Sequence, residues 1–223
     1  MKRLKKFESF VVDEKQDIEY GSLDLAQYMV WYVMFALSIY FFGWMIGFIV
    51  YNVAYLIIEK LLKVFMNLEM MSAGDEQFFG DDYRGTLNIV AYQKYEKFKA
   101  QEVAQTMMQR SCQFRRMKSK VVKFLGKYMF EEMTDEDMML QANKVCPIIT
   151  DIHNDKQLAE FMIDHQSNRL GLNFIQWRIY LIPDYSETES VLVFKIHHSV
   201  ADGIALILLM CSLTDHPKLE DYP

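Results

Sequence analysis

Two adjacent histidines, His197 and His198, are followed at a short fixed interval by Asp202 and Gly203. They end an apolar run, residues 191–197, that predicts a β-strand. Neighbouring side chains on a strand point to opposite faces, so His198 shares its face with apolar residues only, whereas the face of His197 includes a lysine. The first set is Leu192, Phe194 and Ile196, and the second is Val191, Val193 and Lys195. We therefore expect His198 to project into a dry interior, where desolvation keeps its imidazole neutral. A neutral imidazole beside a bound hydroxyl group can act as a general base.

Asp202 and Gly203 favour a catalytic over a purely structural interpretation of this pair of histidines. A lone histidine on an apolar strand is more often a core residue than a catalyst, but here four positions coincide. The aspartate can hold the loop by pairing with a buried base, for which Arg178, Arg84 and Arg169 are all candidates. The glycine leaves room for the close approach of backbone or ligand.

The heptad His197-His198-Ser199-Val200-Ala201-Asp202-Gly203 resembles the HHxxxDG signature of the acyltransferase superfamily that includes chloramphenicol acetyltransferase and peptide-synthetase condensation domains. Within it, the chain looks most like the wax ester synthase/diacylglycerol acyltransferase family. Residues 72–78, SAGDEQF, resemble the Ser-Pro-x-Asp-x-x-Phe stretch of that family. Residues 172–182 resemble its "PLW" strand, with Ile175-Gln176 in place of Pro-Leu before Trp177, and the ending SLTDHPK is also similar.

This resemblance implies the transfer of an acyl group from acyl-CoA, as cosubstrate, to the hydroxyl of a fatty alcohol or diacylglycerol. His198 would deprotonate that hydroxyl for direct attack on the thioester. His197 would be supporting, Asp202 structural and Gly203 permissive. No metal, no tightly bound cofactor and no covalent enzyme intermediate are expected.

Members of this superfamily have two similarly folded halves, and the resemblance covers residues 70–217 of this chain, which corresponds to the N-terminal half. We therefore expect another protein chain to complete or cover the half-domain, because an open half would expose a large apolar surface. The alternative is a non-catalytic accessory subunit of a larger membrane complex, for example a mitochondrial one, built on half of the acyltransferase fold.

A long apolar segment precedes this domain. No charged residue occurs from Tyr28 to Ile58. One helix of that length would measure about 46 Å, which exceeds the roughly 30 Å of the hydrocarbon layer. The pattern predicts one tilted transmembrane helix with its extension over residues 28–65, after an uncleaved polar tail at residues 1–27. Gly43 and Gly47 are spaced so that another helix can approach closely. We expect a single-pass membrane protein of the endoplasmic reticulum or the mitochondrial inner membrane.

Composition excludes several classes of protein. The net charge of −6 over 223 residues gives no reason to expect a nucleic-acid partner. The three cysteines suit neither a disulfide framework nor a zinc site, and Cys146 has no evident base beside it, so we interpret it as an inert thiol. The acidic residues Asp75, Glu76, Asp81 and Asp82 lack calcium-loop spacing and are interpreted as a solvated loop.

The elements expected after the apolar segment alternate between strands and helices. They are a polar connector at 72–84, a strand at 87–95, a helix at 99–110, a strand pair at 118–130, a helix capped by Asn154, a hairpin at 177–182 and 191–197, and a helix at 203–210. The predicted fold class is α/β: one transmembrane helix followed by half of a chloramphenicol-acetyltransferase-like two-layer α/β domain.

Overall fold

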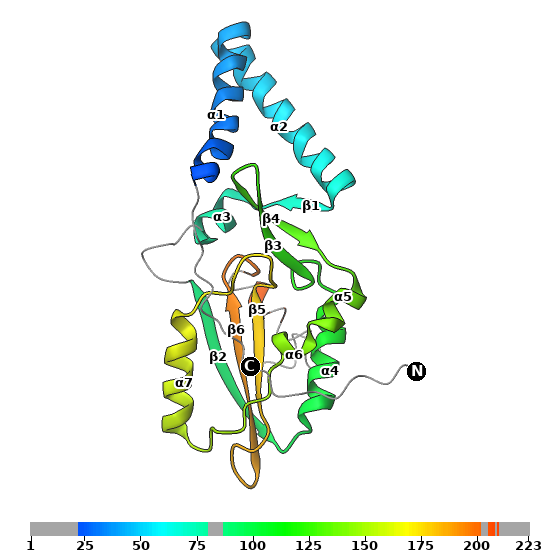
Figure 1. Cartoon of the computed structure of the whole chain (residues 1–223), viewed down its shortest axis with the longest axis vertical. Helices are drawn as coiled ribbons and strands as arrows, with labels where there is room; N and C mark the ends of the chain where they lie inside the picture. Colours follow the sequence, from blue (N-terminus) through cyan, green and yellow to red (C-terminus); the bar gives the residue numbers. More distant parts are fainter. Residues whose placement is uncertain (1–21, 80–86, 202–204, 208, 210–223) are drawn as a thin grey trace.

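The protein consists of a helical hairpin that stands on a mixed α/β domain (Figure 1). The computed structural model describes residues 22–79, 87–201, 205–207 and 209. Its helices are α1 (Ser22–Phe42), α2 (Trp44–Met66), α3 (Ala73–Phe79), α4 (Ala100–Ser111), α5 (Asp135–Leu140), α6 (Ala142–Val145) and α7 (Asp155–Ser167). Its strands are β1 (Leu68–Met70), β2 (Asn88–Glu96), β3 (Ser119–Phe124), β4 (Lys127–Glu132), β5 (Trp177–Ile182) and β6 (Glu189–His197).

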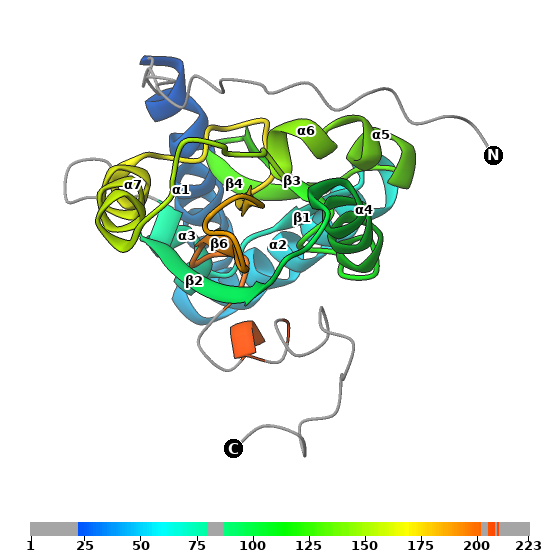
Figure 2. The same cartoon turned by 90° about the horizontal axis from the view of Figure 1, so that it is seen from below.

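The central sheet has the strand order β2-β6-β5 and is antiparallel throughout. Residues 183–188 supply the turn between β5 and β6, as the Pro-Asp-Tyr-Ser sequence predicted. Figures 1 and 2 show α7 on one face of this sheet and α4 with α6 on the other. Because β6 is the middle strand and both faces are covered, almost every residue along it is buried.

Two apolar clusters follow from this layering. On one face, Leu192 and Ile196 of β6 pack with Trp177 of β5 and with Ala104 and Met108 of α4. On the opposite face, residues of β5 and β6 pack with the apolar stripe of α7; these are Tyr180, Ile182, Val191, Val193, Leu158, Phe161 and Met162. The side chain of Asn154 accepts a hydrogen bond from the Gln157 N–H at 3.0 Å, so the predicted cap of α7 is confirmed.

A second antiparallel sheet, β1-β4-β3, lies between the central sheet and the helical hairpin (Figure 1). Its β3–β4 connection is the tight turn at Leu125 and Gly126, both with positive φ, where the sequence predicted a break. The predicted strand at 87–95 and helix at 99–110 are confirmed with small shifts of boundary. The part of the predicted 203–210 helix that the structure describes, at 205–207 and 209, is helical.

Three predictions about elements were wrong or incomplete. Residues 72–84 are not simply a polar connector, because α3 occupies residues 73–79. Helices α5 and α6 were not foreseen, since helices this short carry little periodic pattern. The apolar segment is not one helix either: it breaks at Gly43, whose φ of 74° lies in the left-handed region that glycine adopts without strain.

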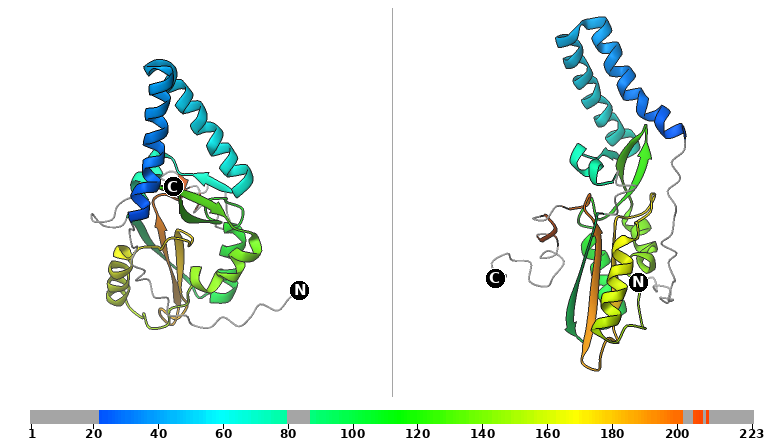
Figure 3. Two further views of the ribbon diagram at one scale, coloured as in Figure 1. Left: turned by 45° about the horizontal axis from the view of Figure 1, so that its top comes forward. Right: turned by 90° about the vertical axis from the view of Figure 1, so that its left-hand side faces the viewer.

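The two helices on either side of Gly43 fold back on each other as an antiparallel hairpin (Figures 1 and 3). Aromatic side chains fill the space between them, with ring centroids 5.1 Å apart for Phe35 and Tyr51 and 5.3 Å apart for Trp31 and Tyr55. Gly47 lies against the backbone of Ser38, so the predicted close helix approach occurs within this chain. Of the described helices, only α2 is long and apolar enough to cross a membrane, and Met29–Phe42 is a shorter apolar stretch.

We predict that Gly47→Leu forces the two helices apart. A Cβ at this position would lie 2.6 Å from the Ser38 backbone oxygen, and backbone cannot rotate away as a side chain can. We expect a cost of about 1–3 kcal/mol from overpacking. The readout is cross-linking of a Phe35→Cys/Tyr51→Cys pair by a short bis-maleimide, which should fall sharply in the Gly47→Leu background. Ile49→Leu, at an exposed position, is the matched control, and equal cross-linking in both backgrounds would contradict this packing.

Candidate active site

The candidate site lies where β6 ends and the chain enters a turn, residues 197–201, which we call the histidine turn. The His197 N–H donates to the Gln176 carbonyl at 2.9 Å, and the His198 N–H donates to the Leu87 carbonyl at 3.0 Å. The two histidines are thus held by the segments that flank β6 on both sides. The Val200 N–H donates to the His197 carbonyl at 3.0 Å and closes the turn.

The ring of His197 is fixed by hydrogen bonds. Its side chain is buried, and its Nδ1 accepts a hydrogen bond from the backbone N–H of Ser199 at 3.2 Å. The Ser199 hydroxyl also lies 2.8 Å from Nδ1. Since Nδ1 is an acceptor, the neutral ring carries its proton on Nε2, and the ring also makes a hydrogen bond to the backbone of Phe78. The fold therefore uses both sides of this imidazole.

Burial, together with the neighbouring His198 ring, lowers the pKa of His197 to about 4, although the Phe78 hydrogen bond opposes both effects. His197 is therefore neutral at physiological pH. We had expected the dry position to belong to His198, and this was wrong: His197 is the more deeply buried ring. The strand parity was sound, but the face of β6 that carries His197 is covered as well, by α7.

His198 is held differently. Its side chain is half-buried, and its ring packs against Phe78 with centroids 4.3 Å apart and an interplanar angle of 37°. Its Nδ1 is buried and has no hydrogen-bond partner in the part of the chain that the structure describes. A buried polar atom without a partner costs stability, so such an atom often marks a group kept for a ligand or a reaction.

Helix α3 brings the predicted 72–78 motif to the histidine turn. The Ser72 hydroxyl accepts a hydrogen bond from the Asp75 N–H at 3.1 Å and donates to the Asp75 carboxylate at 2.9 Å, which is an N-terminal cap. Phe78, one turn further on, contacts both histidines, through its ring for His198 and through its backbone for His197. Two motifs far apart in the sequence thus meet in space.

Arg116 joins the same two segments. Its Nη2 donates to the Asp75 carboxylate at 3.0 Å, and its Nη1 donates to the Ser199 carbonyl at 3.1 Å. The guanidinium also lies 5.3 Å from the ring centroid of Phe130. Asp75 is therefore not part of a solvated loop as predicted, and neither is Glu76, which pairs with Lys127 at 2.8 Å. Sequence reasoning missed Arg116, because nothing in the local pattern indicates the partners of an arginine.

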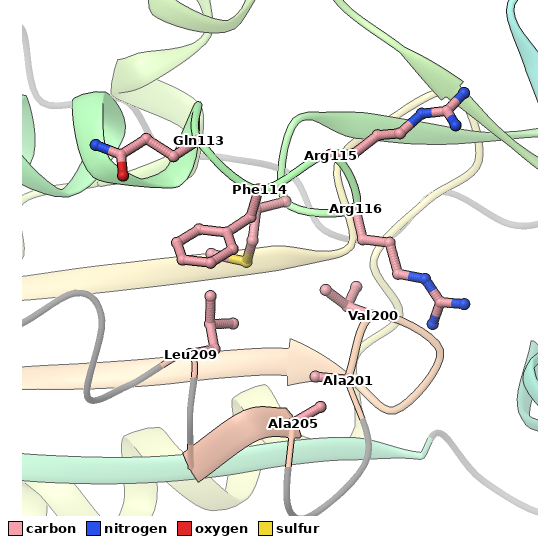
Figure 4. A pocket seen from close by; sticks show the side chains of 9 residues that line it. Gln113, Phe114, Arg115, Arg116, Val200, Ala201, Ala205 and Leu209 are labelled. Atoms are coloured by element: carbon pink, nitrogen blue, oxygen red, sulfur yellow. The ribbon is translucent and has the colours of Figure 1, made fainter. Parts of the chain in front are cut away.

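A cavity of about 420 Å³ adjoins the histidine turn. Its walls are mainly apolar, and Figure 4 shows the side chains of Val200 and Leu209 pointing toward that of Phe114. The lining residues are Gln113, Phe114, Arg115, Arg116, Met117, Val200, Ala201, Ala205 and Leu209. The chain can therefore hold an apolar group immediately beside the residues that follow the two histidines.

The remaining predicted residues have different outcomes. Asp202 and Gly203 lie outside the described residues, as does the predicted pairing of Asp202 with an arginine. Arg178 is buried on β5 in register with Lys195, and its guanidinium lies 5.2 Å from the Phe174 ring centroid. Burial raises the pKa of the Cys146 thiol to about 12, and the interpretation as an inert thiol agrees with this position. Among the described residues, no group of three or more His, Cys, Asp or Glu side chains could hold a metal ion.

We predict that the free energy of unfolding falls as the pH drops from about 6.5 to about 4. In that window the unfolded chain protonates His197, whereas the folded chain, with its lowered pKa, does not. The free energy of unfolding therefore rises with pH within this window, and above the window His197 adds no further dependence on pH. The loss is at most about 3 kcal/mol.

The matched experiment compares urea unfolding of the wild-type chain and a His197→Asn variant across this pH range. The variant is expected to have a shallower pH dependence, whatever its stability at neutral pH. Identical slopes for the two proteins would show that His197 is not held neutral by the fold.

Comparisons with known proteins bear on the fold and on the class of protein that the chain resembles. No protein-family model matches the chain. A probable diacylglycerol O-acyltransferase, tgs1, of Mycobacterium tuberculosis is 29% identical over 69 residues, which are 31% of this chain and 15% of that protein. A putative diacylglycerol O-acyltransferase of Mycobacterium bovis, Mb3154c, matches to the same extent. The matched segment is therefore a small part of these relatives.

Solved structures share the fold at low sequence identity. The first condensation domain of the calcium-dependent antibiotic synthetase superposes with a TM-score of 0.52 and 11% identity, covering 64% of this chain and 35% of that one. The complex of the X-domain and OxyB from teicoplanin biosynthesis gives 0.52 and 10%, covering 65% and 31%. The wax ester synthase/diacylglycerol acyltransferase of Marinobacter aquaeolei gives 0.48 and 17%, covering 62% and 36%.

These matches confirm two expectations from the motifs at a coarse level. The described domain is a mixed α/β fold like that of condensation domains, and it corresponds to about a third of the length of those chains. In sequence, over part of its length, the chain is similar to diacylglycerol O-acyltransferases, and the family that its motifs resemble is the wax ester synthase/diacylglycerol acyltransferase family.

Proposed function

We propose that this chain is part of a membrane-attached O-acyltransferase that moves an acyl group from acyl-CoA to the hydroxyl of a fatty alcohol or diacylglycerol. The similarity to diacylglycerol O-acyltransferases supports acyl transfer as the class of reaction. The finer proposal, that His198 is the general base, depends on one observation. Of two adjacent imidazoles, the fold uses both sides of His197 and leaves Nδ1 of His198 without a partner among the described residues.

The reaction then follows from the position of His198. A ring nitrogen of His198 accepts the proton of the acceptor hydroxyl while that oxygen attacks the thioester carbonyl carbon. The new C–O bond forms, the C–S bond breaks, and the CoA thiolate leaves with the proton that the imidazolium returns. The products are an ester and free CoA, and no covalent enzyme intermediate is needed. His197 contributes as a neutral neighbour of His198, so it adds no positive charge that would oppose protonation of the base.

The remaining residues of the site position the base. Phe78 packs on one side of the His198 ring, and Arg116 fixes the carbonyl of Ser199 in the following turn. The apolar cavity beside Val200 and Ala201 suits a hydrocarbon part of a substrate. Asp202 and Gly203 keep the structural and permissive roles that the family resemblance implies. The exposed apolar surface of α1 and α2 supports attachment to a membrane, and the compartment stays the predicted endoplasmic reticulum or mitochondrial inner membrane.

We predict that His198→Ala lowers the rate of acyl transfer by about 10²–10⁴-fold, the usual contribution of a positioned general base. The assay follows esterification of a long-chain alcohol by labelled acyl-CoA in membranes. It uses the full-length polypeptide that carries this chain, or this chain with the segment that completes its fold. His153→Ala is the matched control, because His153 is exposed and, among the described residues, its hydrogen bonds are to the Asp184 carbonyl and the Gln157 side chain at the far end of the domain. Equal rates for wild type and His198→Ala would rule out His198 as the base.

The second candidate is a non-catalytic accessory subunit that keeps part of the acyltransferase fold and docks on a larger membrane complex. The observation that favours it is the position of β2: in the described part of the chain this strand pairs along one edge only, which leaves its other edge open to a strand of another protein. This candidate predicts stable co-migration with other proteins together with no acyl transfer by either wild type or His198→Ala. An active, monodisperse protein would rule it out.

A further inference from the structure

The surface of the α1–α2 hairpin is apolar on every side near its tip. Around the Gly43 turn, Tyr40 and Phe41 of α1 and Trp44 and Met45 of α2 are 80%, 69%, 69% and 77% exposed. Successive helical residues point about 100° apart, so these side chains surround the hairpin instead of forming one stripe. A protein groove covers one stripe of a helix, whereas a surface that is apolar all round requires an apolar solvent.

Two polar side chains of the hairpin, and the backbone at its turn, make their hydrogen bonds within the hairpin itself. The Ser38 hydroxyl donates to the Phe35 carbonyl at 2.7 Å, and the Asn52 amide donates to the Phe48 carbonyl at 2.7 Å. At the turn, the Gly43 N–H donates to the Ile39 carbonyl, and the Gly43 carbonyl accepts from the Gly47 N–H, both at 2.8 Å. Backbone and side-chain groups must be satisfied internally in this way when hydrocarbon surrounds them.

Charged residues occur only near the base of each arm. Asp24 is the last charged residue before the turn, and Glu59 is the first one after it, followed by Lys60 and Lys63. The charge-free lengths are about 28 Å along α1 and about 24 Å along α2, counted from Gly43. Both arms therefore change from apolar to charged at a similar distance from the tip, as expected for two helices that enter the same surface together.

The hairpin does not stand free of the domain over this whole length. Trp31, in the middle of α1, is buried against the domain, and its Nε1–H donates to the Leu125 carbonyl at the β3–β4 turn at 2.8 Å. From Trp31 to Gly43 the helix rises only about 18 Å. Half of a hydrocarbon layer is roughly 15 Å thick. The free part of α1 thus matches one leaflet and is too short to cross two.

We propose that the α1–α2 hairpin enters one leaflet of a lipid bilayer and returns to the same face, so that the bases of both arms and the α/β domain lie on one side of the membrane. This inference rests on the membrane attachment proposed above, and it replaces the single-pass topology expected from the sequence. Figure 3 shows both arms rising from the same end of the domain, which is the end toward which β6 runs.

This topology has a consequence for the histidine turn. Helix α2 continues through β1 into α3, which carries Phe78 against His198. The turn at the end of β6 therefore faces the membrane side of the domain (Figure 1). The β1-β4-β3 sheet lies between the central sheet and the hairpin, so a lipid alcohol from the leaflet has to pass this sheet to reach the turn.

The test uses single cysteines in the full chain, inserted into sealed vesicles of neutral and anionic phospholipid, in a Cys112→Ser/Cys146→Ala/Cys211→Ser background. Gln27→Cys and Lys60→Cys mark the bases of the two arms, Tyr40→Cys marks the tip, and Glu136→Cys marks the exposed surface of the domain. Each protein is treated with a membrane-impermeant maleimide outside the vesicles, inside them, or after detergent. Pelleting of the same vesicles at alkaline pH reports attachment separately, and no activity is needed.

We expect Gln27→Cys, Lys60→Cys and Glu136→Cys to react from the same side, and Tyr40→Cys to react only after detergent. Reaction of Gln27→Cys and Lys60→Cys from opposite sides would overturn the proposal in favour of a span. Reaction of Tyr40→Cys from the side opposite to Glu136→Cys would show that the hairpin crosses both leaflets. Equal reaction of Tyr40→Cys and Glu136→Cys, from one side, would show that the hairpin stays outside the hydrocarbon, even if the chain pellets with vesicles.

Discussion

The guanidinium of Arg116 binds both segments that define the site, the start of α3 through Asp75 and the histidine turn through the Ser199 carbonyl. Its two donors have a fixed planar geometry, so the spacing between these segments is fixed as well. That spacing places Phe78 where its ring packs on His198 and its backbone bonds His197. The different environments of the two histidines and, through α3, the connection of the site to the α1–α2 hairpin depend on this arrangement.

The two adjacent histidines have identical side chains, but the fold places them in different environments. His197 lies on a face that α7 covers, its Nδ1 accepts from Ser199, and burial keeps it neutral. His198 lies one residue beyond the strand, where its ring is supported by packing against Phe78 and its Nδ1 has no partner in the described chain. His197 is thereby a structural residue, whereas His198 is held in place with its Nδ1 available for a further hydrogen bond.

Features with a local cause could be predicted from the sequence. The Asn154 cap, the β5–β6 hairpin and the glycine turn between β3 and β4 each depend on residues within a few positions of one another. The motifs also indicated the acyltransferase-like fold. The Arg116 contacts and the cover over His197 could not be predicted, because both depend on segments distant in sequence. The break at Gly43 was missed for another reason. The polar residues that usually accompany a turn are absent from this apolar run, and Gly43 alone did not indicate one.

The most direct test of the proposed difference between the two histidines is to observe both imidazoles of the histidine turn by ¹⁵N NMR as the pH is lowered. We predict that His197 shows a protonated Nε2 and an unprotonated Nδ1, and that it remains neutral until the pH approaches 4. In an Arg116→Ala variant this signature should weaken as the turn loosens. A His197 ring that titrates near its ordinary pKa of 6.5 in the wild-type protein, with its proton on Nδ1, would show that the fold does not hold this ring buried and neutral.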